Sequence, residues 1–230
     1  MSRYNNNPDT RAFTLVELLT VLAVIGVLAA LLFPVLSRAK ARAGRALCVN
    51  NLKQVNAAVR MYCDDHGDTL PDTNFVALDY KPLVQGYLGL SGRAWTNGGV
   101  FWCPASEQSM MISPLPPFAI MPRGRFKMEY HLYRFNGGNA DSHSRPGIAG
   151  LKLCSLRSPS KTVTVAEASA FIGQAWHDHK YFDYELGKHV WNMAGFGDGH
   201  VAYTRFHRLS GRLPCAADPP SGYDYQWSGR

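Results

Sequence analysis

Histidine and aspartate side chains crowd into one stretch of the C-terminal half, where they could bind a metal ion. Seven of them fall within 24 positions: His177, Asp178, His179, Asp183, His189, Asp198 and His200. Two imidazoles at alternate positions of a strand would share one face, and nearby carboxylates could complete a site. The same residue types also form turns and pack in hairpins, so both readings stay open. The candidate metal ligands are Asp178, Asp183, His189 and Asp198.

Sequence motifs of common enzymes are missing from the chain. It contains no GxSxG, no HExxH and no phosphate-binding loop ending in Gly-Lys-Ser/Thr. We therefore expect no enzymatic activity. A membrane-anchored periplasmic metal-binding protein or enzyme that uses the cluster from His177 to Asp198 is kept as an alternative.

The chain has a long apolar run near its N-terminus, and this run positions the domain that follows it. From Phe13 to Leu36 every side chain is apolar or small, apart from Glu17 and two threonines. Twenty-four helical residues span about 36 Å, which is enough to cross a bilayer. Glu17 is unexpected there, because a carboxylate in hydrocarbon costs on the order of 2.5–3.5 kcal/mol and is usually functional.

The helix is predicted to continue beyond this apolar run. Residues 37–65 contain no proline, and apolar side chains recur at spacings of four and three: Cys48, Leu52, Val55, Val59 and Tyr62. Gly67 is a candidate C-terminal cap. We therefore expect one helix of about fifty residues, with its first half in the membrane and its second half packed on a head domain.

The sequence of the head domain predicts a small β-sheet. After Pro71, short apolar runs alternate with Gly, Pro and Asn, as is typical of strands and loops. Residues 162–168 are the clearest strand, and residues 192–206 read as a hairpin that turns at Asp198-Gly199. Val201 and Tyr203 should share one face of this hairpin. The predicted fold class is α+β, a long N-terminal helix packed on an antiparallel sheet.

The residues Ala12 to Glu17 read AFTLVE and stand at the start of the apolar run. This stretch resembles the processing site of type IV pilins and type II secretion pseudopilins, with Ala12 in place of the usual glycine. The resemblance implies that a prepilin peptidase cuts between Ala12 and Phe13 and methylates the new amine. Glu17, Gly26 and Pro34 would then be residues 5, 14 and 22 of the mature chain, where the family has glutamate and often glycine and proline.

The resemblance also suggests why the run contains a glutamate. After cleavage Glu17 would lie in the first turn of the helix, where the helix dipole favours an anion. In a filament its carboxylate could pair with the amine of a neighbouring Phe13 and set the axial register, because an unpaired charge there is costly. Gly26 and Pro34 should weaken the helix between them.

Other stretches resemble a group of pilin-like proteins from planctomycete- and verrucomicrobia-like bacteria. These are residues 48–71, 100–104 and 159–167, together with a His, nine residues, Asp-Gly signature. Here His189 and Asp198 are separated by eight residues, so the match is imperfect. Cys48 and Cys103 are a possible disulfide, although the five cysteines leave the connectivity open. Because some pseudopilins hold calcium in a C-terminal loop, calcium is a possible cofactor, and no other is expected.

The expected organisation is a leader peptide (1–12), a transmembrane half-helix (13–36), an amphipathic half-helix (37–66) and a β-rich head (67–230). The protein is expected in the bacterial inner membrane with a single pass, and its head in the periplasm or outside the cell. Two arginines precede the apolar run, whereas four basic residues follow it between Arg38 and Arg45. By the positive-inside rule alone, this excess would place the head in the cytoplasm.

The expected function is that of a structural filament subunit serving type II secretion or a related pilus system. Its expected partners are copies of itself, other pilin-like subunits, a prepilin peptidase, the inner-membrane assembly platform and membrane lipid. Nucleic acid is not expected, since from Asp64 onward 16 basic residues face 15 acidic ones. A surface adhesion or DNA-uptake module is a further alternative, since some relatives of such proteins use filament tips in that way. Sugar binding is also left open, because exposed aromatic rings can stack on sugars. The candidate rings are Trp95, Trp102, Trp176, Trp191 and Trp227.

Overall fold

The computed structural model of the protein describes residues 14–72, 80–92, 99–104, 133–137, 147–172, 189–207 and 218–229. The chain divides into two compact units, Met1–Arg42 and Ala43–Arg230. The first contains the apolar half of a long helix, and the second contains the other half of that helix and the sheet.

The long helix α1 runs from Leu15 to Asp65, 51 residues in all, which confirms the expected single helix of about fifty. Its end is shaped by two residues with left-handed backbone, Gly67 at φ 61° and Asp68 at φ 65°. The N–H of Asp68 donates to the carbonyl oxygen of Cys63 at 2.8 Å, so the last turn is closed as a glycine C-cap requires.

The N-terminal half of α1 is exposed along its whole circumference. Among the described residues, α1 is the one helix long and apolar enough to cross a membrane, with a mean hydropathy of 2.8 in its most apolar window. None of that window is buried within the protein. Large apolar side chains from Leu15 to Leu36 are more than 45% exposed. A helix that is apolar all round needs an apolar environment, and lipid or other helices can provide it.

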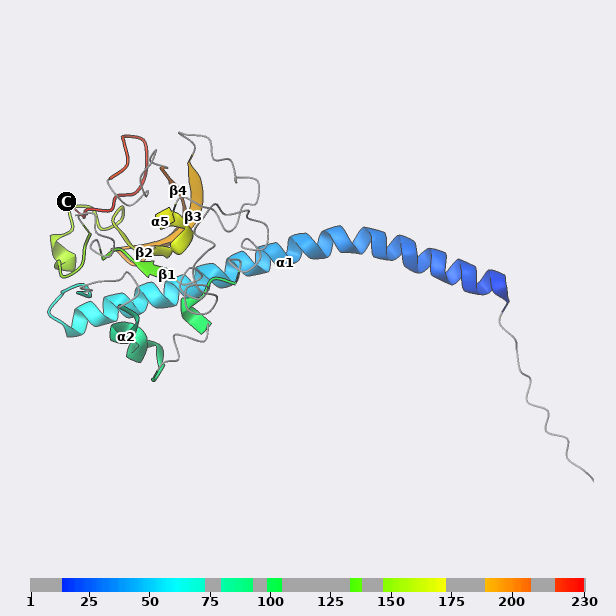
Figure 1. Cartoon of the computed structure of the whole chain (residues 1–230), viewed down its shortest axis with the longest axis horizontal. Helices are drawn as coiled ribbons and strands as arrows, with labels where there is room; N and C mark the ends of the chain where they lie inside the picture. Colours follow the sequence, from blue (N-terminus) through cyan, green and yellow to red (C-terminus); the bar gives the residue numbers. More distant parts are fainter. Residues whose placement is uncertain are drawn as a thin grey trace, which may run out of the picture. The chain divides into compact units, whose positions relative to one another are not determined.

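The head contains a four-stranded antiparallel sheet in the order β1-β2-β3-β4 (Figure 1). Its strands are β1 (Tyr133–Phe135), β2 (Val163–Glu167), β3 (Val190–Phe196) and β4 (Val201–Phe206). The short helices described around it are α2 (Tyr80–Val84), η1 (Gln85–Leu88), η3 (Gly99–Phe101), η5 (Leu153–Ser155) and α5 (Ala168–Ile172). The sheet confirms the predicted α+β class, and both the strand over residues 162–168 and the hairpin over residues 192–206 are present.

The sheet buries both of its faces. One face packs on α1, whose predicted apolar face is buried at Cys48, Leu52, Val55 and Val59 and half-buried at Tyr62. The other face packs on a C-terminal segment that contributes Tyr225 and Trp227. Val201 and Tyr203 contact the α1 side, whereas Ala202 and Phe206 contact the other side, as the period of two requires.

Candidate functional site

The N-terminus of α1 is closed by a reciprocal pair of side chains. The backbone N–H and the hydroxyl of Thr14 both donate to Glu17 Oε2, at 2.9 and 2.7 Å. In return the N–H of Glu17 donates to Thr14 Oγ1 at 3.3 Å. This is a capping box, in which two otherwise unpaired donors of the first turn are satisfied. The predicted processing residues Ala12 and Phe13 lie outside the described residues.

This cap shows how a single chain accommodates the glutamate of the apolar run. The carboxylate of Glu17 is exposed and bonded within its own first turn. It is therefore accessible to a cation from another chain, while the capping box holds it in place. The predicted pairing of Glu17 with an amine on a neighbouring subunit involves a second chain and stays a prediction.

Gly26 and Pro34 both lie inside α1, which is helical on either side of each. Proline has no N–H to donate, and its own carbonyl oxygen accepts a bond from the Ser37 hydroxyl at 3.0 Å. Around Gly26 no atom lies within 4 Å of the place where a Cβ would stand. The predicted weakening of the helix between these residues stays a prediction.

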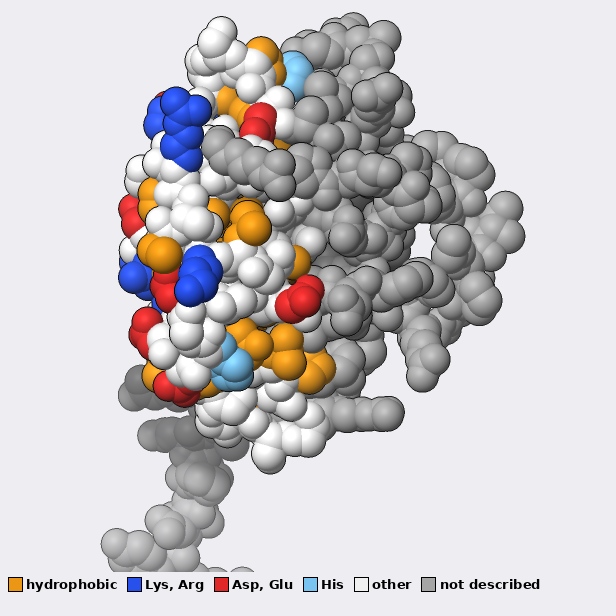
Figure 2. All heavy atoms as spheres, turned by 90° about the vertical axis from the view of Figure 1, so that its left-hand side faces the viewer, with side chains coloured by type: hydrophobic (Ala, Val, Ile, Leu, Met, Phe, Trp, Pro, Cys, Tyr) orange, Lys and Arg blue, Asp and Glu red, His pale blue; other side chains and the backbone are white. Residues whose placement is uncertain are grey.

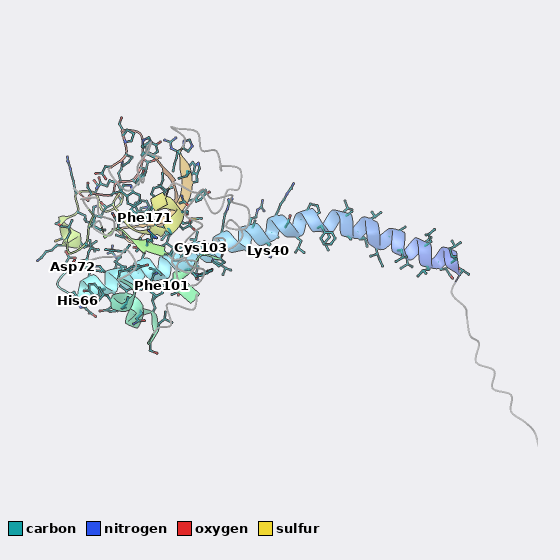
Figure 3. All side chains as sticks on the ribbon, in the orientation of Figure 1. Lys40, His66, Asp72, Phe101, Cys103 and Phe171 are labelled. Atoms are coloured by element: carbon teal, nitrogen blue, oxygen red, sulfur yellow. A yellow bond between two sulfur atoms is a disulfide. The ribbon has the colours of Figure 1, made fainter. Side chains whose placement is uncertain are left out.

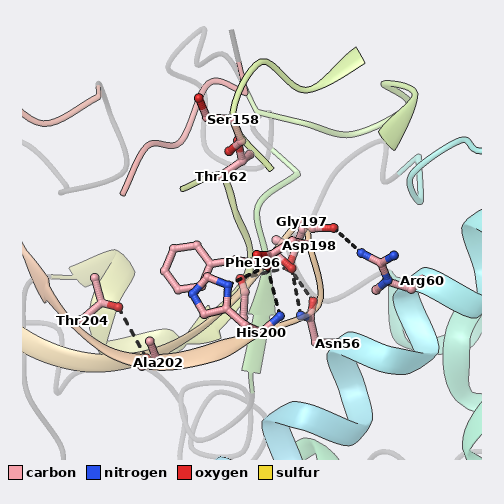
Figure 4. A network of polar contacts seen from close by, with 12 residues as sticks. Asn56, Arg60, Ser158, Thr162, Phe196, Gly197, Asp198, His200, Ala202 and Thr204 are labelled. Carbon is pink, nitrogen blue, oxygen red and sulfur yellow. Dashed lines mark hydrogen bonds and ion pairs between the residues drawn. The ribbon is translucent and has the colours of Figure 1, made fainter. Parts of the chain in front are cut away.

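A polar joint fastens α1 to the β3–β4 hairpin (Figure 4). Asn56 is buried on α1; its side-chain amide donates to the Phe196 carbonyl oxygen at 3.0 Å, and its Oδ1 accepts from the Thr164 hydroxyl at 2.6 Å. One turn further, Arg60 Nη1 donates to the Gly197 carbonyl oxygen at 2.6 Å. These bonds fix the position of the hairpin along the helix, because each side chain meets a particular backbone carbonyl.

A disulfide provides a second link between α1 and the rest of the head. Cys48 on α1 is bonded to Cys103, which follows η3 and lies beside α1 in Figure 3. The two Cα atoms are 5.1 Å apart. This is the pairing that the sequence analysis named as possible. Of the other described cysteines, Cys63 is buried and Cys154 is exposed, and both are free thiols.

A buried carboxylate that the sequence analysis did not single out adjoins this disulfide. Glu167 Oε1 lies 3.3 Å from Cys103 Sγ, and Glu167 Oε2 accepts a bond from the Met193 N–H at 3.1 Å. Possible ligand atoms of Cys48, Cys103 and Glu167 lie within 4.8 Å of one another. Because the two sulfurs are bonded to each other, they do not act as thiolate ligands, and the cluster links three elements of the fold.

Of the four predicted metal ligands, the structure describes His189 and Asp198, and it does not bring these two together. Asp178 and Asp183 lie outside the described residues, as do His177 and His179. His189 precedes β3 and Asp198 follows it, so the seven residues of the strand separate them. At about 3.3 Å per residue the separation exceeds 20 Å, which is far too long for one ion to bridge. His189 and Asp198 therefore cannot share an ion within one chain, and calcium binding stays untested.

Asp198 instead pairs with His200 across the hairpin turn. Its Oδ1 lies 2.6 Å from His200 Nδ1 and also accepts the His200 N–H at 3.1 Å. Burial alone would raise the pKa of Asp198, but the hydrogen bonds from His200 outweigh it and lower the pKa. The His200 ring stacks on Phe196 with ring centroids 4.3 Å apart. The turn residue thus orients an exposed imidazole.

The described head surface carries both signs of charge. Figure 2 shows one face, on which basic, acidic and hydrophobic side chains are interspersed over the described residues. The mixed charge of this face agrees with the nearly neutral composition of the chain from Asp64 onward.

Comparison with known proteins bears on the N-terminal segment. Residues 8–33 match the family model described as the prokaryotic N-terminal methylation motif. The N-terminal helix is pilin-like. This match includes Ala12, Phe13, Glu17 and Gly26, and the helix is followed by the α+β arrangement described above.

A relative of established function is similar to part of the chain. The type II secretion system core protein G of Pectobacterium carotovorum subsp. carotovorum is 36% identical over 76 residues. The match covers 33% of this chain and 49% of the relative, so the chain spans about half the length of the curated relative it matches. No solved structure matches the chain.

Proposed function

We propose that this chain is a structural subunit of a filament built from the bacterial inner membrane, serving type II secretion or a related pilus system. The observation that carries the proposal is the methylation motif at residues 8–33, which overlaps the start of a helix long and apolar enough to cross a membrane. A prepilin peptidase would cut between Ala12 and Phe13 and methylate Phe13. The released subunits would then pack their helices against one another.

The head is proposed to lie in the periplasm, or outside the cell once the filament has formed. The Cys48–Cys103 disulfide supports this topology, because disulfides persist in oxidising compartments. As an argument about topology, the disulfide outweighs the positive-inside rule. That rule, applied to the basic residues after the apolar run, favours the opposite orientation. Those residues would instead contact anionic headgroups or neighbouring subunits.

The proposed role of Glu17 is to pair with the amine of a neighbouring Phe13 during assembly. Its observed capping bonds to Thr14 suggest a second role, which is to begin the helix. The two roles can be separated, because a capping box accepts glutamine as well as glutamate. Glu17→Gln keeps the cap and removes the charge, whereas Thr14→Val weakens the cap and keeps the charge.

The experiment compares these variants in cells that assemble the filament. Membrane insertion is measured by carbonate extraction, and incorporation by the amount of the chain in sheared filaments. We expect Glu17→Ala and Glu17→Gln to insert normally and to be absent from filaments, and Thr14→Val to be incorporated. Normal assembly of Glu17→Gln would refute the pairing role. Loss of assembly in Thr14→Val alone would show that only the cap matters.

A further inference from the structure

Three side chains that can bind a metal ion meet in the core of the head. Cys48 lies on α1, Cys103 follows η3 (Figure 3), and Glu167 ends β2. All three are fully buried, and one possible ligand atom of each lies within 4.8 Å of the other two. In the part of the chain that the structure describes, no other three His, Cys, Asp or Glu side chains come this close together. We refer to these three residues as the buried cluster.

The sheet holds the carboxylate of Glu167 beside the sulfurs. Glu167 is paired with Tyr133 in the register of β1 and β2, and its Oε2 accepts the N–H of Met193 on β3 at 3.1 Å. Its other oxygen, Oε1, lies 3.3 Å from Cys103 Sγ. The Tyr133 hydroxyl donates to the Cys48 carbonyl oxygen at 2.9 Å, which ties the same turn of α1 to the sheet. The buried cluster is therefore assembled by the fold itself.

The spacing in the buried cluster suits a zinc ion. Zinc binds thiolate sulfur at about 2.3 Å and carboxylate oxygen at about 2.0–2.2 Å in tetrahedral geometry, so a sulfur and an oxygen on one ion lie about 3.5 Å apart. Cys103 Sγ and Glu167 Oε1 are 3.3 Å apart. Two sulfurs on one ion lie about 3.8 Å apart, which the 5.1 Å between the Cα atoms of Cys48 and Cys103 allows once their bond is broken. Thiolate ligands favour zinc over calcium, which prefers oxygen.

The disulfide decides whether these ligands are present. While the two sulfurs are bonded to each other, neither is a thiolate. A dithiol reductant gives two electrons to the Cys48–Cys103 bond and two protons to its sulfurs, and the dithiol itself closes to a disulfide. Zinc then displaces the two protons, because a metal binds the thiolate form of cysteine. The reduced cluster thus offers the ion two thiolates and one carboxylate.

We propose that the reduced head binds one zinc ion through the thiolates of Cys48 and Cys103 and the carboxylate of Glu167. The ion joins the same part of α1 to the segment after η3 as the disulfide does, and it adds a bond to β2. The head therefore keeps a link at this place when its disulfide is absent. Three protein ligands leave the fourth position of a tetrahedral ion to water. The proposal concerns the head alone, so it holds whether or not α1 is processed and assembled.

The test uses the full chain in detergent, reduced with dithiothreitol and then desalted without air, because the dithiol would otherwise compete for the metal. Zinc binding is measured by competition with a chromogenic chelator. Cobalt serves as a spectroscopic substitute, since charge transfer from thiolate to cobalt absorbs in the near ultraviolet. We expect one tightly bound ion per reduced chain, with thiolate charge transfer, and none in the oxidised chain. A reduced chain that binds no zinc, or an oxidised chain that binds it equally well, would overturn the proposal.

Two variants and one control assign the ligands. Cys48→Ser removes a thiolate, and Glu167→Gln removes the carboxylate charge but keeps an oxygen for the Met193 N–H. Loss of groups that only orient metal ligands costs about 10–100-fold in affinity, so each variant should bind zinc about tenfold more weakly or worse. Cys154→Ser removes an exposed free thiol outside the buried cluster and should bind as the wild type does.

Thermal unfolding of the reduced proteins gives a second readout, because an ion that binds only the folded state raises the midpoint. Zinc should raise the midpoint of the reduced wild type and of Cys154→Ser, and it should leave that of Cys48→Ser unchanged. Circular dichroism checks that each variant is folded. Wild-type affinity in folded Cys48→Ser or Glu167→Gln, or a midpoint of the reduced wild type that zinc does not raise, would overturn the assignment.

Discussion

The side-chain amide of Asn56, in the middle of the amphipathic half of α1, donates a hydrogen bond to the carbonyl oxygen of Phe196 at the end of β3, 3.0 Å away. The same side chain accepts a bond from Thr164 on β2. One buried amide thus joins the helix to two strands, 108 and 140 residues further along the chain. Such a contact fixes how the head is seated on its own segment of helix.

The Asn56 contact requires a glycine on the facing strand. A Cβ built on Gly195 would lie 2.8 Å from Asn56 Cγ, closer than real Cβ atoms approach. We therefore expect Gly195→Ala to lower the free energy of unfolding of the head by about 1–3 kcal/mol, as overpacking usually does. Gly86→Ala is the control, because nothing lies within 4 Å of its Cβ position. Equal denaturation midpoints for the two variants would contradict the account of the joint.

The Cys48–Cys103 disulfide should stabilise the head substantially. It closes a loop with a sequence separation of 55, for which the chain-entropy treatment gives about 4 kcal/mol. Thermal unfolding of the wild type with and without dithiothreitol should show a clear drop in midpoint on reduction. Cys154→Ser, which removes an exposed free thiol, should retain the wild-type response. A midpoint that does not change with reductant would show that this link is not stabilising.

The exposed thiol of Cys154 should react slowly for a free cysteine. A side-chain hydrogen bond to the Asp68 carboxylate is the main cause that raises the pKa of Cys154. Since the thiolate is the nucleophile, a raised pKa lowers the alkylation rate at pH 8. Asp68→Asn keeps an oxygen for the Cys154 N–H and tolerates the positive φ of residue 68, but it removes the charge.

We therefore expect Asp68→Asn to be alkylated by iodoacetamide several-fold faster than the wild type at pH 8. The two rates should converge at high pH, where both thiols are ionised. Peptide mapping by mass spectrometry distinguishes Cys154 from the other cysteines. The buried Cys63 should stay unmodified in both proteins until they are unfolded. Identical rates at pH 8 would mean that Asp68 does not control this thiol.

Local patterns predicted the long helix α1, the strand β2 and the β3–β4 hairpin. The apolar side chains from Cys48 to Tyr62 follow a helical period, and the helix does bury that face. Alternation and an Asp-Gly turn predicted the β3–β4 hairpin and the residues on each of its faces. These features are visible because they depend on neighbours within a few positions, where backbone geometry determines which side chains point the same way.

Contacts between distant segments could not be predicted in the same way. Glu167 meets Cys103, and Asn56 meets Phe196, only because the strands pair in a particular register on a particular length of helix. No local pattern carries that information.

His189 and Asp198 lie close together in the sequence, but the strand β3 stands between them. An extended strand separates its ends by its full length, so residues at its two ends cannot converge on one ion. Proximity in sequence suggests a shared site only where the chain turns back between the residues.

The central claim is that the segment matching the methylation motif is processed by a prepilin peptidase. The most direct test is the intact mass and N-terminal residue of the chain recovered from membranes of cells that contain this peptidase. A protein that begins at methylated Phe13, together with its absence in a strain lacking the peptidase, is the predicted result. A protein that retains Ala12 and the residues before it under both conditions would contradict the account.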